Sequence, residues 1–213
     1  RSGSDVRARL ALTCLCFVLT GCQTLRRQPV AENMLSSRQI SMRGIDASQR
    51  GRWDEAEAAF RSAIERCPDY DREHAGYAEA LWQRGERDQA IAHQQRAVQL
   101  SGGDPEMTTR LGRMHLEQGE HAVAEHRAEQ ALRGNKELAV AWRLRGDVMR
   151  ERGDLDDAIG CYHRALAIQA FYPEEQLALA DTYQMQDRPQ RALATLEVLT
   201  ERYGPGKIGR AHV

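Results

Sequence analysis

The sequence has few aromatic residues, almost no net charge and no long apolar run. Aromatic residues make up only 6% of the chain, so its core must consist mainly of aliphatic side chains and alanine, which favours closely packed helices. The 30 basic and 31 acidic residues leave a formal charge of −1, and without a positive field no nucleic-acid partner is expected. The longest apolar stretch, residues 10–19, is shorter than the roughly 20 residues that span a bilayer. This composition excludes disordered, collagen-like and polytopic membrane classes.

Residues 1–22 have the features of a signal peptide in the usual order. Two arginines precede the short apolar stretch, which ends Leu19-Thr20-Gly21-Cys22 and resembles the lipobox of bacterial lipoproteins. That resemblance implies cleavage before Cys22, lipidation of its thiol, and a lipid-anchored protein of the bacterial cell envelope. The outer membrane or the periplasmic face is then favoured over the cytoplasm. A buried core helix is the alternative, and residues 23–36 are expected to be a tether.

The cysteines predict neither a disulfide nor a metal site. Cys14, Cys16 and Cys22 belong to the signal segment, which leaves Cys67 and Cys161 in the folded part. These two are 94 residues apart, too far in a repeat architecture for the Cα separation of under about 7 Å that a disulfide requires. We expect two free, mostly buried thiols, with no metal and no cofactor.

Between residues 37 and 203 the sequence repeats every 34 residues without an insertion. Four series of small residues keep this spacing: Gly51, Gly85, Gly119 and Gly153, with Asp187 in fifth place; Ala56, Ala90, Ala124, Ala158 and Ala192; Gly44, Ala78, Gly112, Gly146 and Ala180; and Ala63, Ala97, Ala131 and Ala165, before Leu199 breaks the series. This pattern resembles the tetratricopeptide repeat, a helix–turn–helix unit.

Each series has a physical role in such a unit. The small residue at Gly146 and its equivalents lets the first helix approach the second. The glycine ends the first helix in a left-handed conformation, which Asp187 also tolerates. Three acids open second helices, where we expect them to cap free backbone N–H groups: Asp54, Asp88 and Asp156.

An aromatic residue lies between the two alanines of a second helix in repeats one and four, at Phe60 and Tyr162. Gln94 takes this place in repeat two and Ala128 takes it in repeat three. We expect weaker packing in these two repeats, whose phase is nevertheless intact.

The resemblance implies an all-α fold, a right-handed α-α superhelical solenoid of about five repeats over residues 37–206. The expected repeats are 37–70, 71–104, 105–138, 139–172 and 173–206. The last helix, around residues 189–203, lacks a polar cap, so the native gene is expected to continue. Residues 207–213 match the translation of a widely used sequencing-library adapter and are treated as a non-native tail.

In this family the first helices line a concave groove that holds peptides. The corresponding positions are Glu79 and Trp82 in repeat two; Arg110, Arg113, Leu116 and Glu117 in repeat three; Arg143, Asp147, Arg150 and Glu151 in repeat four; and Asp181, Gln184 and Met185 in repeat five. Arginines in such a groove can hold carboxylates by paired hydrogen bonds, unless each one pairs with a neighbouring acid such as Glu106 or Asp147. An exposed Trp82 is a candidate binding anchor, and its alternative role is to cover a helix junction.

Catalytic motifs are missing from the sequence. The seven histidines are scattered, and G-x-S-x-G, H-E-x-x-H and glycine-rich phosphate loops do not occur. We predict a non-enzymatic, lipid-anchored envelope protein whose groove binds a protein or peptide and which reaches the membrane through its lipid. Two alternatives stay open: the recognition arm of a larger enzyme truncated at its C-terminus, and a soluble periplasmic repeat protein.

Overall fold

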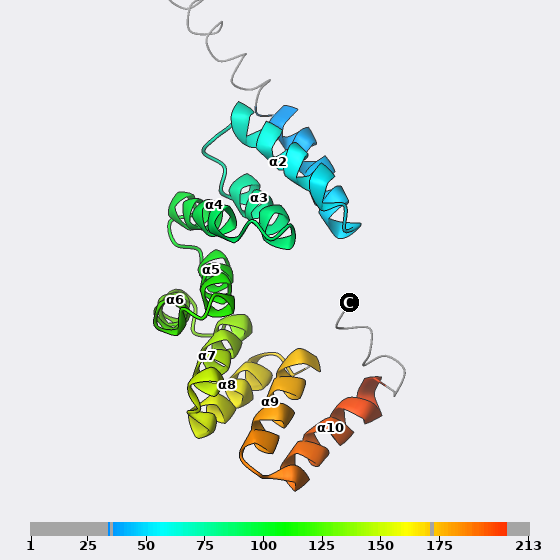
Figure 1. Ribbon diagram of the computed structural model, residues 1–213, viewed down its shortest axis with the longest axis vertical. Helices are drawn as coiled ribbons and strands as arrows, with labels where there is room; N and C mark the ends of the chain where they lie inside the picture. The colour runs from blue at the N-terminus through cyan, green and yellow to red at the C-terminus, as the bar shows by residue number, and fades with distance from the viewer. Residues whose placement is uncertain (1–33, 35, 171–172, 204–213) are drawn as a thin grey trace, which may run out of the picture. The chain divides into compact units, whose positions relative to one another are not determined.

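The computed structural model describes residue 34, residues 36–170 and residues 173–203, in which all regular structure is helical (Figure 1). The predicted signal peptide, most of the tether and the predicted tail lie outside the described residues. A helix over residues 36–49 is followed by α2 (Trp53–Arg66), α3 (Asp71–Gln83), α4 (Arg87–Leu100), α5 (Pro105–Glu117), α6 (His121–Gly134), α7 (Ala139–Arg152), α8 (Leu155–Ile168), α9 (Pro173–Met185) and α10 (Pro189–Tyr203). None of the helices in these ranges is long and apolar enough to cross a membrane.

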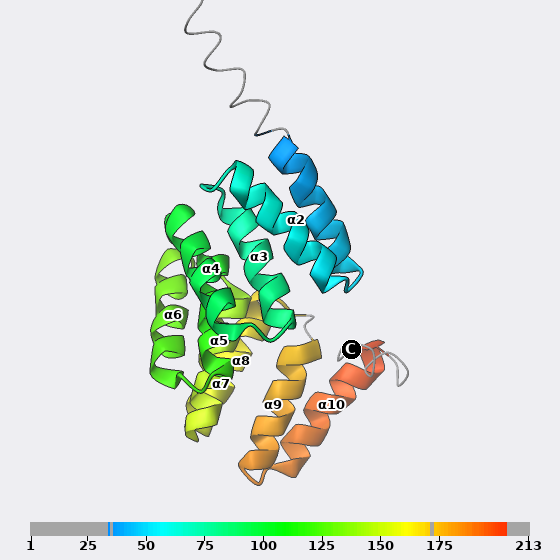
Figure 2. The ribbon, with the colours of Figure 1, turned by 45° about the horizontal axis from the view of Figure 1, so that its top comes forward.

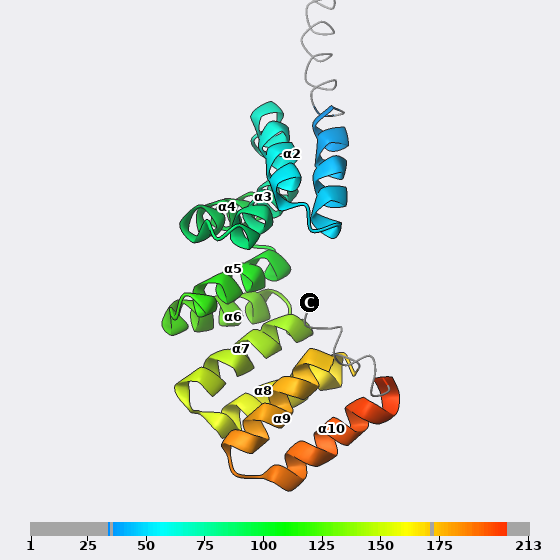
Figure 3. The same cartoon turned by 45° about the vertical axis from the view of Figure 1, so that its right-hand side comes forward.

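The predicted all-α repeat fold is confirmed. Successive helices form antiparallel hairpins, seen for α9 with α10 in Figure 2 and for α5 with α6 and α7 with α8 in Figure 3. The chain divides into two compact units, an N-terminal unit up to Arg84 and a C-terminal unit from Gly85 onward. This division falls inside the second predicted repeat, between α3 and α4.

The first helices end at left-handed residues, as the glycine series predicts. The φ angle is 69° at Gly51, 84° at Gly85, 77° at Gly119 and 88° at Gly153, and 57° at Asp187. The next backbone N–H then donates to a carbonyl five residues earlier, as from Asp154 to Met149 at 2.9 Å and from Arg188 to Tyr183 at 2.9 Å. The carbonyl groups at the helix ends are thus satisfied within the turn.

The small residue in a first helix makes room for the aromatic ring of its second helix. A Cβ atom at Gly146 would lie 2.7 Å from Cε1 of Tyr162, and one at Gly44 would lie 2.9 Å from Cζ of Phe60. Both rings are buried, with exposed fractions of 0% for Tyr162 and 3% for Phe60. Glycine is therefore needed at these two positions both to leave space for the ring and to let the two helices pack closely.

Repeats two and three fill the place of the missing ring differently. The side chain of Gln94 is fully buried, and its Nε2 donates to the backbone oxygen of Met107 in α5 at 2.9 Å. Its Oε1 has no hydrogen-bond partner among the described residues, which is costly for a buried carbonyl. Ala128 is covered by Leu144 and Val148 of α7, so the next repeat supplies the missing apolar volume.

The prediction that acids cap the second helices is wrong. The N-cap residues of α2, α4 and α8 make no side-chain cap hydrogen bond, and the acids lie inside the first turn. Asp54 instead lies 3.0 Å from Nε of Arg84, and Asp156 accepts a hydrogen bond from Nε2 of Gln186 at 2.9 Å. Both contacts join the start of a second helix to the end of the following first helix. The negative charges of Asp54 and Asp156 are still stabilised by the positive end of the helix dipole.

One type of ion pair between neighbouring repeats recurs at every second repeat. Glu57 is paired with Arg84, and Glu125 is paired with Arg152 at 2.7 Å. The equivalent residues of the repeats between and after these are isoleucine and glutamine: Ile91 with Gln118, and Ile159 with Gln186. The sequence therefore has a longer period of two repeats superimposed on the 34-residue period.

Gly146→Ala is expected to lower the free energy of unfolding by about 1–3 kcal/mol, because the added Cβ overlaps the buried ring of Tyr162. Urea denaturation followed by circular dichroism measures this change.

Gly160→Ala is the matched control, since Gly160 lies inside α8 and its added Cβ meets no atom within 4 Å. This variant is expected to raise the free energy of unfolding by about 0.5–1 kcal/mol, because alanine is the better helix former. Equal effects of the two substitutions would contradict the packing role of Gly146.

Candidate functional site

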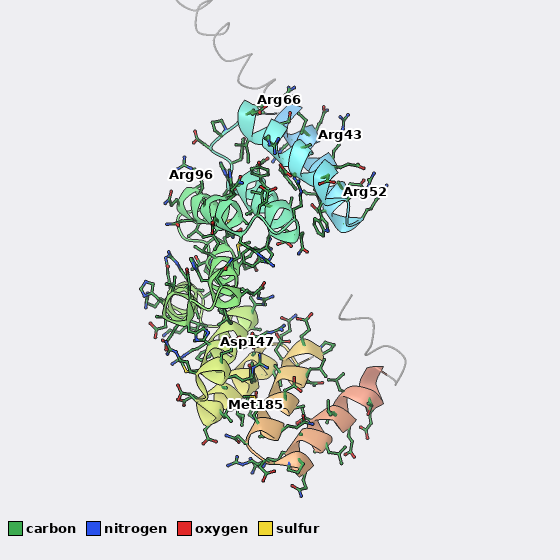
Figure 4. All side chains as sticks on the ribbon, in the orientation of Figure 1. Arg43, Arg52, Arg66, Arg96, Asp147 and Met185 are labelled. Carbon is green, nitrogen blue, oxygen red and sulfur yellow. The ribbon has the colours of Figure 1, made fainter. Side chains whose placement is uncertain are left out.

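The first helices of the C-terminal unit, α5, α7 and α9, form a row in which α7 contacts both of the others. We call their predicted groove positions the first-helix face; Figure 4 labels Asp147 on α7. By the 34-residue register, Arg113 on α5, Asp147 on α7 and Asp181 on α9 occupy equivalent places in their repeats. The charge therefore changes sign along this row.

Arg143, on α7, is surrounded by carboxylates. Its guanidinium donates to Glu174, lies 3.6 Å from Asp147 through Nε, and lies 3.8 Å from Glu175. Burial alone would lower the pKa of Arg143, but the hydrogen bond to Glu174 and the nearby negative charges outweigh it and raise that pKa above its usual value. Arg143 is permanently charged and neutralised by its neighbours, as the pairing alternative anticipates.

Asp147, like Arg143, already interacts with neighbouring side chains. It accepts a hydrogen bond from the hydroxyl of Tyr162 at 2.7 Å and lies 4.0 Å from a guanidinium nitrogen of Arg150. Burial is the main reason that the pKa of Tyr162 is raised, and the charge and hydrogen bond of Asp147 raise it further. Tyr162 thus stays protonated and remains a donor to this carboxylate.

Glu175 is a buried carboxylic group next to this cluster. It is 1% exposed, and neither of its oxygens has a hydrogen bond to the described residues. Burial raises the pKa of Glu175, although the charge of Arg143 opposes this shift. The equivalent residue three repeats earlier, Glu73, accepts a hydrogen bond from Ser41 at 2.7 Å instead. The arginine is therefore peculiar to the junction of repeats four and five.

Arg110 and Arg113 differ from Arg143 because neither has an ion-pair partner in the described ranges. Arg110 is exposed and Arg113 is half-buried. The expected pairing with Glu106 does not occur. Asp181 on α9 is exposed and also lacks an ion pair within the described part of the chain, and Met185 is 57% exposed (Figure 4). These groups remain available to a ligand.

Two of the predicted groove residues belong to the core instead. Trp82, in the N-terminal unit, is only 8% exposed, so it presents little surface as a binding anchor. Leu116 is 7% exposed and packs in one cluster with Leu144 and Val148. The sequence pattern locates these positions on first helices but does not distinguish an open side chain from one covered by the next repeat.

Three further predicted positions have neighbours at the helix ends. Glu117 lies 3.8 Å from Arg87, and Glu151 lies 3.0 Å from Nε2 of His121. The two contacts are equivalent, because both residues of the second pair lie 34 positions after those of the first. In the N-terminal unit, Glu79 accepts a hydrogen bond from Gln83 at 2.9 Å. Gln184, the last of the predicted positions, is exposed.

A pocket of about 280 Å³ lies between α7 and α8. Its lining residues are Trp142, Arg145, Met149, Asp156, Asp157, Gly160 and Cys161. Burial is the main cause that raises the pKa of Cys161, so its thiol stays protonated and is a poor nucleophile. Cys67 is free and half-buried. The described residues contain no cluster of His, Cys, Asp or Glu side chains suited to a metal ion.

Sequence reasoning missed Glu174 and Glu175, which hold Arg143 in place. Glu174 occupies the second position of its repeat, a groove position in the family, so the register gave a signal for it. Glu175 had no such signal, because its role depends on burial against α7. The hydroxyl of Tyr162 has no signal in the sequence either, because the repeat pattern predicts only a packing role for the ring.

Sequence profiles described as the tetratricopeptide repeat match residues 41–105 and 109–173, and a further one matches residues 176–204. The chain belongs to the tetratricopeptide repeat family. The two longer matches begin 68 residues apart, because each covers about two repeats. Proteins of this family are generally non-catalytic scaffolds that bind protein or peptide partners.

Several solved structures share the fold. TTC0263, a thermophilic repeat protein of Thermus thermophilus, is 22% identical with a TM-score of 0.71, and the match covers 80% of this chain and 93% of that one. The pilF protein of Pseudomonas aeruginosa is 20% identical with a TM-score of 0.71, covering 83% and 78%. MamA of Desulfovibrio magneticus RS-1 is 17% identical with a TM-score of 0.66, covering 84% and 97%. No curated protein matches the chain.

Glu175→Gln is expected to gain stability relative to the wild type as the pH rises from about 4 to about 7. Because the folded state raises the pKa of Glu175, the wild type binds more protons folded than unfolded in this range, and its stability falls with rising pH. Glutamine removes this dependence at nearly equal volume. Urea denaturation at the two pH values measures the difference.

Glu129→Gln, an exposed glutamate on α6, provides the baseline for general effects of a lost charge. A Glu175→Gln variant whose stability relative to the wild type is the same at both pH values would show that folding leaves the pKa of Glu175 unshifted.

Proposed function

We propose that this chain is a non-enzymatic, lipid-anchored protein of the bacterial cell envelope that uses the first-helix face of its C-terminal unit to bind another protein. The observation that carries the proposal is the contrast between its arginines. Arg143 is paired with Glu174 and Asp147 and lies beside Glu175, whereas Arg110 and Arg113 have no ion-pair partner in the described residues.

Arg110 and Arg113 are three residues apart on α5, so their side chains share one helical face. Guanidinium groups form paired, charge-assisted hydrogen bonds with carboxylates, which makes an acidic side chain of a partner the natural ligand. Family members generally bind proteins or peptides, and this property supports a binding role over catalysis.

The envelope location rests on the lipobox-like Leu19-Thr20-Gly21-Cys22, which lies outside the described residues. A lipid on Cys22 would hold the repeats at a membrane surface without a spanning helix. Binding at that surface then amounts to recruiting or assembling other envelope proteins.

Labelled palmitate is expected to enter the protein when the gene is expressed in a bacterium that processes lipoproteins, and to be lost in Cys22→Ser. Cys16→Ser is the matched control, because it removes a thiol from the same segment and leaves the lipobox intact. A cleaved but unlabelled wild type would instead identify a soluble periplasmic protein.

Arg110→Glu combined with Arg113→Glu is expected to reduce capture of envelope proteins by the immobilised chain at least severalfold, because like charges then face the acidic partner. Arg133→Glu combined with Arg164→Glu, at exposed positions on the second helices α6 and α8, controls for the same change in net charge. Equal losses in both double variants, or unchanged capture in Arg110→Glu with Arg113→Glu, would remove this face from the binding site.

A further inference from the structure

The three first helices of the C-terminal unit carry different charges at equivalent places. On α5, Arg110 and Arg113 are cationic and have no ion pair in the described part of the chain. On α9, Asp181 is anionic and likewise unpaired there. The face is therefore basic at its α5 side and acidic at its α9 side.

The middle helix, α7, separates these charges without adding one of its own. Its Asp147 is engaged by Tyr162, Arg143 and Arg150, and its Arg143 is engaged by Asp147 and by glutamates of α9. A ligand would have to break these contacts to use either group. The groups open to a ligand are therefore the arginines of α5 and the aspartate of α9.

The spacing of these groups follows from helix packing. Neighbouring packed helices lie about 8–10 Å apart, so Arg113 and Asp181, two helices apart at the same register, are separated by about 16–20 Å. An extended chain advances about 3.3 Å per residue. Two side chains about five or six residues apart in an extended segment would therefore reach both groups.

We infer that the first-helix face recognises an extended protein segment with an acidic side chain that binds Arg110 and Arg113 and a basic side chain, about five or six residues away, that binds Asp181. This inference rests on the proposed function and specifies the chemistry of the partner. A uniformly acidic segment would be repelled by Asp181 and Glu174 on α9, and a uniformly basic one by the arginines on α5.

A random peptide library tests this pattern directly. Displayed peptides of about 12 residues, long enough to cross all three helices when extended, are selected on the immobilised full chain. Selected peptides are then synthesised and measured by fluorescence anisotropy. We expect most of them to carry an acid and a base about five or six residues apart, and replacing either charge with serine is expected to weaken binding about two- to fivefold, as for exposed ion pairs.

A charge-swapped protein provides the decisive comparison. In Arg113→Asp combined with Asp181→Arg the net charge is unchanged, and the protein is expected to prefer peptides in which the acid and the base are exchanged. Arg133→Asp combined with Glu129→Arg, on the outer helix α6, should leave the preference of the wild type in place. Circular dichroism and thermal melting confirm that each variant is folded.

The outcomes separate this inference from the proposed function. Peptides that lose affinity in Arg110→Glu with Arg113→Glu but show no spaced acid–base pair, or keep their preference after the charge swap, overturn the inference and leave a binding face. Peptides that bind regardless of all these substitutions overturn the proposed function as well. A library that yields no binder to the folded chain counts against both.

Discussion

The contact between the ring of Tyr162 and the backbone at Gly146 connects the core of repeat four to its surface. The ring fills the space that a side chain at residue 146 would occupy, and so fixes how α7 and α8 pack. Its hydroxyl then emerges beside Asp147 and donates to it at 2.7 Å. Because Asp147 in turn contacts Arg143, the packing of the hairpin also determines which charges on the first-helix face are already neutralised.

The same backbone unit carries different chemistry in each repeat because packing constrains only some of its positions. The glycines and alanines of the four series are buried or needed for the turn, whereas first-helix positions that face outward vary freely. Position nine of the repeat is arginine on α5 and aspartate on α7 and α9. A repeat array can thus hold its fold constant and change its ligand.

Contacts between neighbouring repeats add a second level of order. Glu57 with Arg84 and Glu125 with Arg152 alternate with isoleucine and glutamine at the equivalent positions. Other ion pairs, such as Arg87 with Glu117 and Arg143 with Glu174, join the junctions where this pair is replaced by neutral residues. The carboxylate of the first pair, Glu57, is buried, whereas Glu125 in the second pair is half-buried.

The sequence by itself determined the helical hairpins, their register and the left-handed turns, because these follow from local periodicity and from small residues that recur every 34 positions. It also placed the candidate binding residues on first helices. Only the tertiary structure decided which of these side chains are open. Trp82 and Leu116 are buried, Arg143 is neutralised by residues about 30 positions later, and Arg110 and Arg113 are left unpaired in the described ranges. The physical reason is that exposure and charge pairing depend on the neighbouring repeat, whose side chains vary independently of the period.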